Sequence, residues 1–293
     1  MPVIDCHVHL YPPELNAAPE AWAAARGERH WATLCTRRRR DGRPVQGFPT
    51  VGDLLRDLDR AAIDRAVLLG WYWEQPETCA WHNRFLASCV RAHPDRLDAF
   101  ATVHAGAGRE VCLAEMARAR EEGLKGLGEL CPPAQGYSYT EETLRDVLRQ
   151  AAAWGWPVNL HVTDPSGRAY PGRIETPLDE VRALVRSHPG TPFILAHWGG
   201  SLAFGWSGDE TQPDNVYFDT AASPLLYGVE VWARELPRVG AGRVLFGSDY
   251  PLHLYPRNEE QDGLGRFVAE ARAGGAEAAV FGGNLRRLLE GVR

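Results

Sequence analysis

The chain has 293 residues, 44% of them hydrophobic, and carries a formal net charge of −6. This length suits one large domain, because α/β barrels commonly run to about 250 residues or more as a single unit. The acidic balance argues against nucleic-acid binding, which calls for a surplus of Lys and Arg, and no apolar run approaches the roughly 20 residues that a membrane span needs.

Eight short apolar runs follow one another along the chain, with helical patterns between them. Amphipathic stripes follow Thr50 and Thr140, and Thr176 with Pro177 is typical of a helix start. Near-continuous apolar strands that alternate with helices indicate parallel pairing with both faces buried. We therefore predict an α/β fold, a (β/α)8 TIM barrel formed by a single domain over residues 1–293. The predicted strands cover residues 2–10, 64–70, 96–104, 124–130, 157–162, 191–197, 215–223 and 243–251.

Two segments depart from this regular alternation. A long loop insertion is expected at about 11–48, between the first strand and the first helix, and it carries the run RRRR at 37–40. Residues 198–214, between strands six and seven, are predicted to be mostly loop. Neither segment breaks the barrel pattern, because surface connections tolerate insertions and partly degraded helices.

The first strand, in the stretch IDCHVH, places two histidines one residue apart. Because successive side chains of a strand point to opposite faces, Asp5, His7 and His9 should share one face. Cys6 and Val8 should then point the other way, towards the helices. Two imidazoles on one face can act as a pair of metal ligands, but further ligands must come from elsewhere in the chain.

Further candidate ligands lie at the carboxyl ends of other predicted strands, where the active residues of such barrels are found. Any one of the candidate histidines taken alone would be interpreted as a buried, hydrogen-bonded core residue. Four histidines at matched strand ends favour a metal site instead. The first strand ends with His7 and His9, and the later ones end with Glu129 (strand four), His161 (five), His197 (six) and Asp249 (eight).

The stretches DCHVH, NLHV, LAHWGG and LFGSDYP, followed by FGGNLRRLL, resemble the amidohydrolase superfamily. The resemblance is to the branch that contains aminocarboxymuconate-semialdehyde decarboxylase, the resorcylate-type decarboxylases and related lactonases, and it implies a barrel of the metal-dependent hydrolase type. It implies that His7, His9, His161 and Asp249 hold a divalent metal, and that His197 is a general base or stabilises the transition state.

Three imidazoles and a carboxylate suit Zn²⁺, with Mn²⁺ as the second choice, and leave a position for a water molecule. One ion per chain is favoured over two. Glu129 could bridge a second ion with His161 and His197, or bind substrate, or lie at the surface. Asp5 could orient an imidazole or serve as a hydrogen-bonding residue at the bottom of the barrel.

The substrate is expected to be a small, carboxylated or aromatic molecule. The resemblance implies a carboxylate-binding arginine in the first long loop, and the sequence does not single it out. Aromatic rings near the mouth could stack on a planar substrate, or they could simply pack. The candidates are Arg37, Arg38, Arg39, Arg40 and Arg43 for the carboxylate, and Trp71, Trp73 and Trp198 for the ring.

Hydrolysis is the favoured reaction, with metal-activated water attacking a lactone, ester or amide carbonyl while Asp249 passes the proton to the leaving group. Non-oxidative decarboxylation of an aromatic or muconate-like acid on the same site is the alternative. A non-catalytic metal-binding protein is the third interpretation. A homodimer stays open. The six cysteines form no C-x-x-C pair, and no signal-peptide pattern is present, so reduced thiols and a cytoplasmic location are expected.

Overall fold

Eight parallel strands form a closed ring in the computed structural model, which describes residues 2–206, 211–256 and 263–292. One sheet has the order β1-β2-β3 and the other β4-β5-β6-β7-β8. Parallel bridges Ala101–Leu127 and Val8–Tyr250 join the two sheets at both seams. The predicted TIM barrel is confirmed. The strands are β1 (Ile4–Val8), β2 (Arg65–Leu69), β3 (Leu97–Phe100), β4 (Leu127–Leu130), β5 (Val158–Leu160), β6 (Phe193–Leu195), β7 (Val216–Asp219) and β8 (Val244–Leu245).

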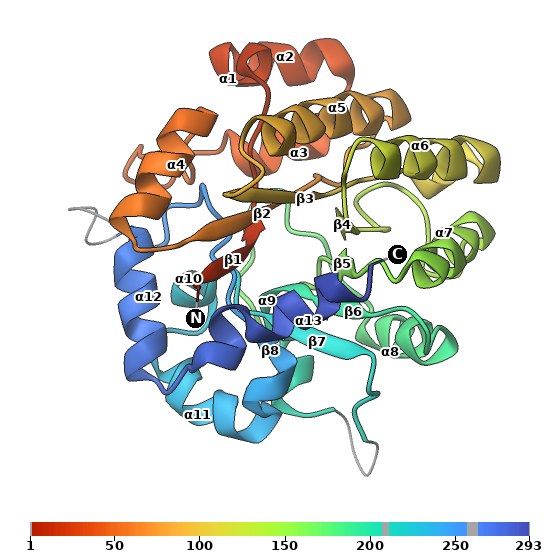
Figure 1. Cartoon of the computed structure of the whole chain (residues 1–293). Coiled ribbons are helices and arrows are strands. Elements are labelled where there is room, and N and C mark those ends of the chain that lie inside the picture. Colours follow the sequence, from red (N-terminus) through yellow and green to blue (C-terminus); the bar gives the residue numbers. More distant parts are fainter. Residues whose placement is uncertain (1, 207–210, 257–262, 293) are drawn as a thin grey trace.

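Helices surround the ring of strands, as Figure 1 shows. The helix after Thr50 begins with a capping box, in which Thr50 and Asp53 satisfy each other's backbone N–H groups. The outer helices are α4 (Val51–Arg60), α5 (Pro76–Ala92), α6 (Arg109–Glu121), α7 (Glu142–Trp154), α8 (Leu178–Ser187), α11 (Glu230–Val239) and α12 (Gly263–Ala273). Short helical turns add α9 (Ala196–Gly200), α10 (Ser223–Leu226), Ala105–Ala107, Leu202–Phe204, Ala241–Arg243 and Ala279–Gly283.

The strands bury side chains on both faces. Ala66 and Leu68 of β2 pack in the same cluster as the helix residues Leu54 and Leu58. Val67 and Leu69 of the same strand pack instead inside the ring, in a second cluster. Helix α13 (Asn284–Glu290) lies over the middle of the ring in Figure 1 and contributes two leucines to that inner cluster. The inner cluster consists of Ile4, Cys6, Val67, Leu69, Phe100, Ile194, Leu245, Leu285 and Leu288.

The predicted orientation of Cys6 is wrong. Cys6 belongs to the cluster inside the ring, whereas Val8 packs on the helix side. Strict alternation would put both on one face, but the pairing of β1 with β2 shifts register between Asp5 and Val8. Such an irregularity inserts an extra residue and reverses the facing of the later residues of the strand.

The insertion at 11–48 is more structured than the predicted loop. It contains α1 (Pro13–Ala17), α2 (Pro19–Arg26) and α3 (Arg29–Cys35), which lie beside α5 in Figure 1. Its rings pack with those that follow β2 into one aromatic cluster, and this burial drives helix formation that local patterning did not reveal. The cluster includes Tyr11, Trp22, Trp31, Trp71, Tyr72, Trp73 and Trp81.

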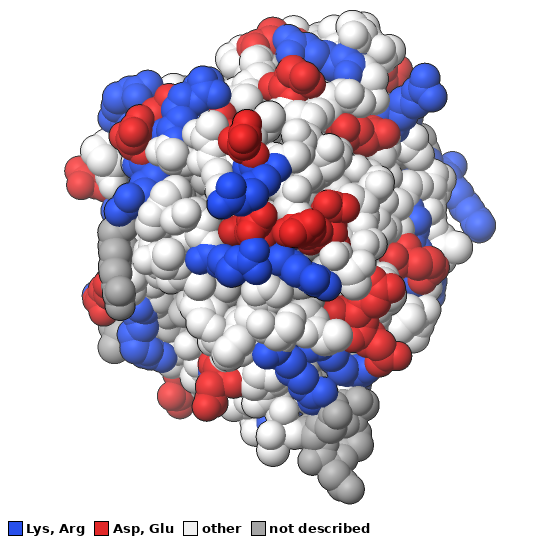
Figure 2. Space-filling view, turned by 90° about the vertical axis from the view of Figure 1, so that its right-hand side faces the viewer, with Lys and Arg blue, Asp and Glu red and all other residues white. Residues whose placement is uncertain are grey.

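The crossover between β6 and β7 has only short turns among its described residues, as predicted, and 207–210 of the predicted loop lie outside them. Figure 2 shows acidic and basic side chains intermingled on one face of the molecule. Within the described part of the chain, no helix combines the length and the apolarity that crossing a bilayer demands.

Candidate metal centre

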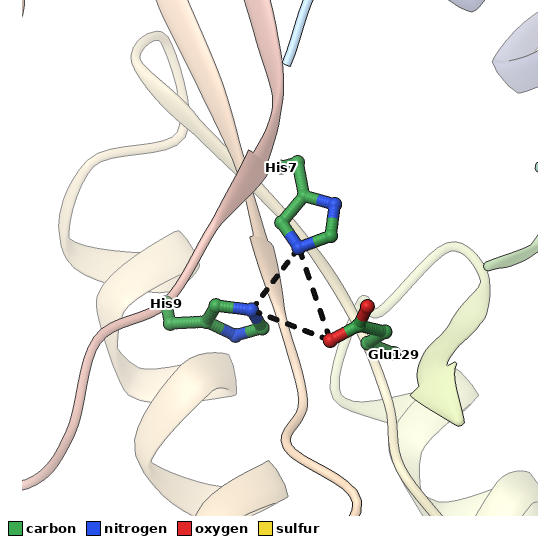
Figure 3. Close-up of side chains that lie close together, drawn as sticks. All are labelled: His7, His9 and Glu129. Carbon is green, nitrogen blue, oxygen red and sulfur yellow. Dashed lines mark hydrogen bonds and ion pairs between the residues drawn. The ribbon is translucent and has the colours of Figure 1, made fainter. Parts of the chain in front are cut away.

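His7 of β1 and His9, which follows that strand, lie close to the carboxylate of Glu129 in β4 at the carboxyl end of the barrel (Figure 3). The Nε2 atoms of His7 and His9 are 3.1 Å apart. Glu129 Oε2 lies 3.9 Å from the first and 3.6 Å from the second. Asp249 Oδ1 lies 3.7 Å from both nitrogens. These four atoms form the first donor group, and all four residues are buried.

A second donor group forms around the other oxygen of the same carboxylate. Glu129 Oε1 lies 2.9 Å from His161 Nδ1 and 3.5 Å from His197 Nε2. These two ring nitrogens are 3.3 Å apart. Glu129 therefore stands between the two groups with one oxygen in each. The structure brings together every residue that the sequence proposed as a ligand, and it groups His161 with Glu129 and His197.

Hydrogen bonds at the far side of two rings determine which nitrogen carries the proton. His7 Nδ1 lies 2.9 Å from Asp219 Oδ2, and His197 Nδ1 lies 3.1 Å from the carbonyl oxygen of Ala221. Both partners accept hydrogen bonds, so each Nδ1 must be the donor. In the neutral rings, each Nε2 then presents a lone pair towards the oxygens of Glu129.

The charges of the site call for a cation. Burial alone would lower the pKa of His7, but the carboxylates of Asp219, Glu129 and Asp249 outweigh it and raise that pKa to about 10. Burial alone would raise the pKa of Glu129, but His161 and His7 hold it well below its usual range. Ligands about 2.0–2.1 Å from a tetrahedral Zn²⁺ are separated by about 3.3 Å, close to the distances in the first group. The donor set therefore fits a divalent ion.

The sequence interpretation missed Asp219, whose carboxylate is fully buried at the end of β7. Asp219 lies in the middle of the seventh predicted strand, 215–223, and only the shorter observed strand places it at a strand end like the other candidates. It makes the ring contact that was considered for Asp5. Asp5 Oδ1 instead accepts the backbone N–H groups of His7 and Ser248, at 3.1 and 2.9 Å. Asp5 thus joins the backbone of β1 to the segment that follows β8. The imidazole ring of His7 is contacted instead by Asp219 of β7.

His197 does not sit in a regular strand or helix. It has φ 58° and ψ 47°, and Trp198 has φ 56° and ψ 27°, in a left-handed turn directly after β6. This conformation costs about 1–2 kcal/mol for each residue that is not glycine. Tyr227 Oη donates to the carbonyl of His197 at 3.2 Å, and Trp198 Nε1 donates to Ser223 Oγ at 2.8 Å. Residues that follow β7 therefore hold the turn in place.

The three candidate tryptophans occupy different surroundings. Trp71 lies edge-on to His9, with ring centroids 5.0 Å apart, and stacks on Tyr72 at 4.3 Å. Trp73 is fully buried in the aromatic cluster, and its Nε1 donates to a ring nitrogen of α5. Trp198 is also fully buried and packs with residues on the helix side. The rings of Trp73 and Trp198 are enclosed by packing, so nothing in their surroundings supports the predicted substrate contact.

Arg37 stands out among the five candidate arginines. Its guanidinium lies over the ring of Tyr170, 4.7 Å from the centroid, and it is half-buried. Burial raises the pKa of Tyr170, Arg37 lowers it, and Asp249 and Glu129 raise it further. Tyr170 therefore lies within electrostatic reach of the centre, and Arg37 lies beside it while donating to the carbonyl of Leu34 at 3.0 Å.

The other four arginines are directed to other places. Arg38 donates to a backbone carbonyl of its own turn, and Arg39 donates to the carbonyl of His253. Arg43 pairs with Asp41 and donates to the carbonyl of Pro256. Arg40 is exposed. The contacts of Arg39 and Arg43 fasten the insertion to the loop after β8.

The chain is similar to known proteins over nearly its whole length. The family model described as Amidohydrolase matches residues 4–290. No curated protein matches the chain. A solved 5-carboxyvanillate decarboxylase from Sphingomonas paucimobilis is similar, with a TM-score of 0.70, 18% identity, and coverage of 100% of this chain and 99% of the other.

Two further solved structures show the same fold. The 5-carboxyvanillate decarboxylase from Novosphingobium aromaticivorans, complexed with manganese and 4-hydroxy-3-methoxy-5-nitrobenzoic acid, has a TM-score of 0.70 and 16% identity, over 99% of this chain and 96% of that chain. A probable 2-pyrone-4,6-dicarboxylic acid hydrolase from Acinetobacter baumannii, with citric acid bound, has a TM-score of 0.63 and 14% identity, over 99% and 100%. At these identities the likeness concerns the fold.

Proposed function

The chain belongs to the amidohydrolase family, as the sequence resemblance predicted, and from this premise we propose that it is a metal-dependent hydrolase of a small, carboxylated substrate. The bond that it cleaves is that of a lactone, ester or amide. The observation that carries the proposal is the position of Glu129, whose two oxygens belong to two different groups of donor atoms.

The donor groups indicate where divalent ions would be held. His7, His9, Asp249 and one oxygen of Glu129 would hold the first ion, and the other oxygen of Glu129 with His161 and His197 would hold a second. The sequence favoured a single ion, and the second donor group is our reason for proposing two sites of unequal affinity. Zn²⁺ suits the imidazole-rich set best, with Mn²⁺ as the alternative. Ions held there would lower the pKa of a water molecule and polarise a substrate oxygen.

The side chains around the centre bind and orient the substrate. Arg37, whose guanidinium lies over Tyr170, is the residue that we assign to pair with a carboxylate of the substrate. The stacked rings of Trp71 and Tyr72 form a wall against which a planar substrate can lie. Asp249 turns Oδ1 to the first donor group and Oδ2 towards His197 Nδ1 at 4.0 Å. It is therefore the residue that we assign to move the proton to the leaving group.

Decarboxylation is the second candidate function. Two of the solved structures with this fold are described as 5-carboxyvanillate decarboxylases, and one of them was complexed with manganese. The same donor atoms and Arg37 would hold an aromatic carboxylic acid equally well. A non-catalytic metal-binding role is the third candidate. It does not account for the buried left-handed turn that directs His197 towards the centre.

Substrate panels distinguish these candidates. Protein stripped of metal and reloaded with Zn²⁺ or Mn²⁺ is incubated with a panel of carboxylated lactones and with a panel of hydroxybenzoates. We expect ring opening of a lactone that consumes water, and no release of CO₂. CO₂ release from a hydroxybenzoate would contradict hydrolysis and support the second candidate.

The role of Glu129 is tested separately by metal content. We expect the wild type to bind two equivalents and Glu129→Gln to bind one or none, because the amide cannot bridge two cations. Glu77→Gln removes an exposed carboxylate from α5 and serves as the control. One equivalent in the wild type would refute the two-site proposal and return Glu129 to substrate binding.

A further inference from the structure

The Asp219 carboxylate contacts both halves of the proposed centre without belonging to either donor group. Oδ2 lies 2.9 Å from His7 Nδ1 and accepts the amide N–H of Asn159 at 2.9 Å. Oδ1 accepts the backbone N–H groups of His197, at 3.0 Å, and Ala221, at 3.1 Å. All four contacts are buried, so water cannot replace any that is lost.

The contact to His197 holds a backbone that would not adopt its shape unaided. His197 and Trp198 have left-handed φ values of 58° and 56°, which residues with a Cβ rarely adopt. Such a conformation persists only when the surroundings determine it. Oδ1 of Asp219 fixes the N–H at the start of this turn, and with it the direction in which the imidazole of His197 points.

The contact to His7 determines where the lone pair of that ring points. Because Oδ2 can only accept, Nδ1 carries the proton, and Nε2 is left to face His9 and Glu129. A carboxylate behind a ligating imidazole also makes the imidazole a stronger base towards a metal.

We propose that Asp219 is a positioning residue that sets the tautomer of His7 and the direction of His197 together, and so couples the two donor groups. The proposal rests on the proposed function only in treating these histidines as working parts of a metal site. Asp219 itself belongs to neither donor group.

Replacement by asparagine separates the two oxygens chemically. Asp219→Asn keeps the size of the side chain but offers one acceptor and one N–H₂ donor. With its oxygen on the N–H groups of His197 and Ala221, its N–H₂ faces His7 Nδ1. That ring must then carry its proton on Nε2, which directs an N–H at His9. With the opposite orientation, the support of the left-handed turn is lost.

The experiment compares Asp219→Asn with Asn159→Ala. The second variant removes the hydrogen bond from Asn159 to Asp219 Oδ2 but leaves both histidines in contact with Asp219. Zn²⁺ affinity is measured by titrating stripped protein against a competing chelator, and folding is followed by thermal unfolding of the stripped forms. We expect Asp219→Asn to weaken Zn²⁺ binding by about 10- to 100-fold. Asn159→Ala should bind Zn²⁺ within about threefold of the wild type, because both histidines keep their positions.

Zn²⁺ affinity unchanged by Asp219→Asn, or reduced equally by Asn159→Ala, would overturn the proposal and leave Asp219 a packing residue. Nitrogen-15 NMR of the wild type provides a second test, which does not require any variant with altered burial to fold. The Nδ1–H of His7, assigned in the wild type through its couplings to the other nuclei of the same ring, should be present with and without Zn²⁺. Its absence in the wild type would overturn the proposal even where Zn²⁺ binds, whereas its presence in a protein that binds no Zn²⁺ would refute the proposed function alone.

Discussion

Glu28 of the insertion is expected to make folding stability fall as the pH rises towards neutrality. Its fully buried carboxylate accepts the backbone N–H groups of Glu74, at 2.8 Å, and Gln75, at 3.2 Å. These residues follow the aromatic wall Trp71–Tyr72, so Glu28 fastens the insertion to the loop that carries the wall. Burial raises the pKa of Glu28 from 4.5 to about 7, with Thr78 and Glu74 N–H lowering it and the charge of Glu74 raising it.

The sign and size of the effect follow from this pKa. Because folding raises the pKa of Glu28, the folded state binds the proton more tightly than the unfolded state. The contribution of Glu28 to the free energy of unfolding is therefore greatest below about pH 4.5. The stability is lost progressively up to about pH 7. At about 1.4 kcal/mol for each tenfold change in proton affinity, the loss amounts to about 3 kcal/mol.

Urea unfolding of the wild type and Glu28→Gln from pH 5 to pH 8 measures this contribution. The glutamine cannot ionise, so the free energies of unfolding should converge or cross as the pH rises, with the wild type losing about 2–3 kcal/mol relative to the variant. Glu77→Gln removes an exposed carboxylate nearby and should follow the wild type. Parallel curves for the wild type and Glu28→Gln would refute the reasoning.

Three other outcomes are expected. Chelation should abolish turnover and leave circular dichroism unchanged, because the core of the barrel does not depend on the metal; unfolding by chelator would make the metal structural. His161→Ala and His197→Asn should each lose the second metal equivalent and reduce turnover by about 10²-fold or more. If His197→Asn keeps its metal but loses turnover, His197 is a general base, as the resemblance implied. Arg37→Gln should raise KM for a carboxylated substrate about 10-fold or more and barely change KM for a neutral ester. Arg40→Gln, at an exposed position, should change neither KM value. Equal effects of the two variants would argue against a substrate role for Arg37.

Much of the architecture could be predicted because strand and helix patterns are local. The eight apolar runs and the helix start at Thr50 depend on neighbours a few residues apart. The helix predicted to start at Thr176 begins at Leu178, and Thr176 does not cap it. The insertion was harder to predict. Its helices are short, and they are stabilised by packing of Trp22 and Trp31 against rings that follow β2, a contact between distant parts of the chain.

For the site, the sequence alone determined the inventory: His7, His9, Glu129, His161 and Asp249 each close a predicted strand, and strand ends of a parallel barrel must meet at one mouth. Only the tertiary structure decided how these residues are grouped, since distances of 3–4 Å between strand ends depend on register and twist around the ring. The break in alternation at Cys6, the left-handed turn at His197, the choice of Arg37 and the role of Asp219 also came from the structure. Each depends on hydrogen bonds or packing between residues far apart in the chain, and no local pattern encodes such contacts.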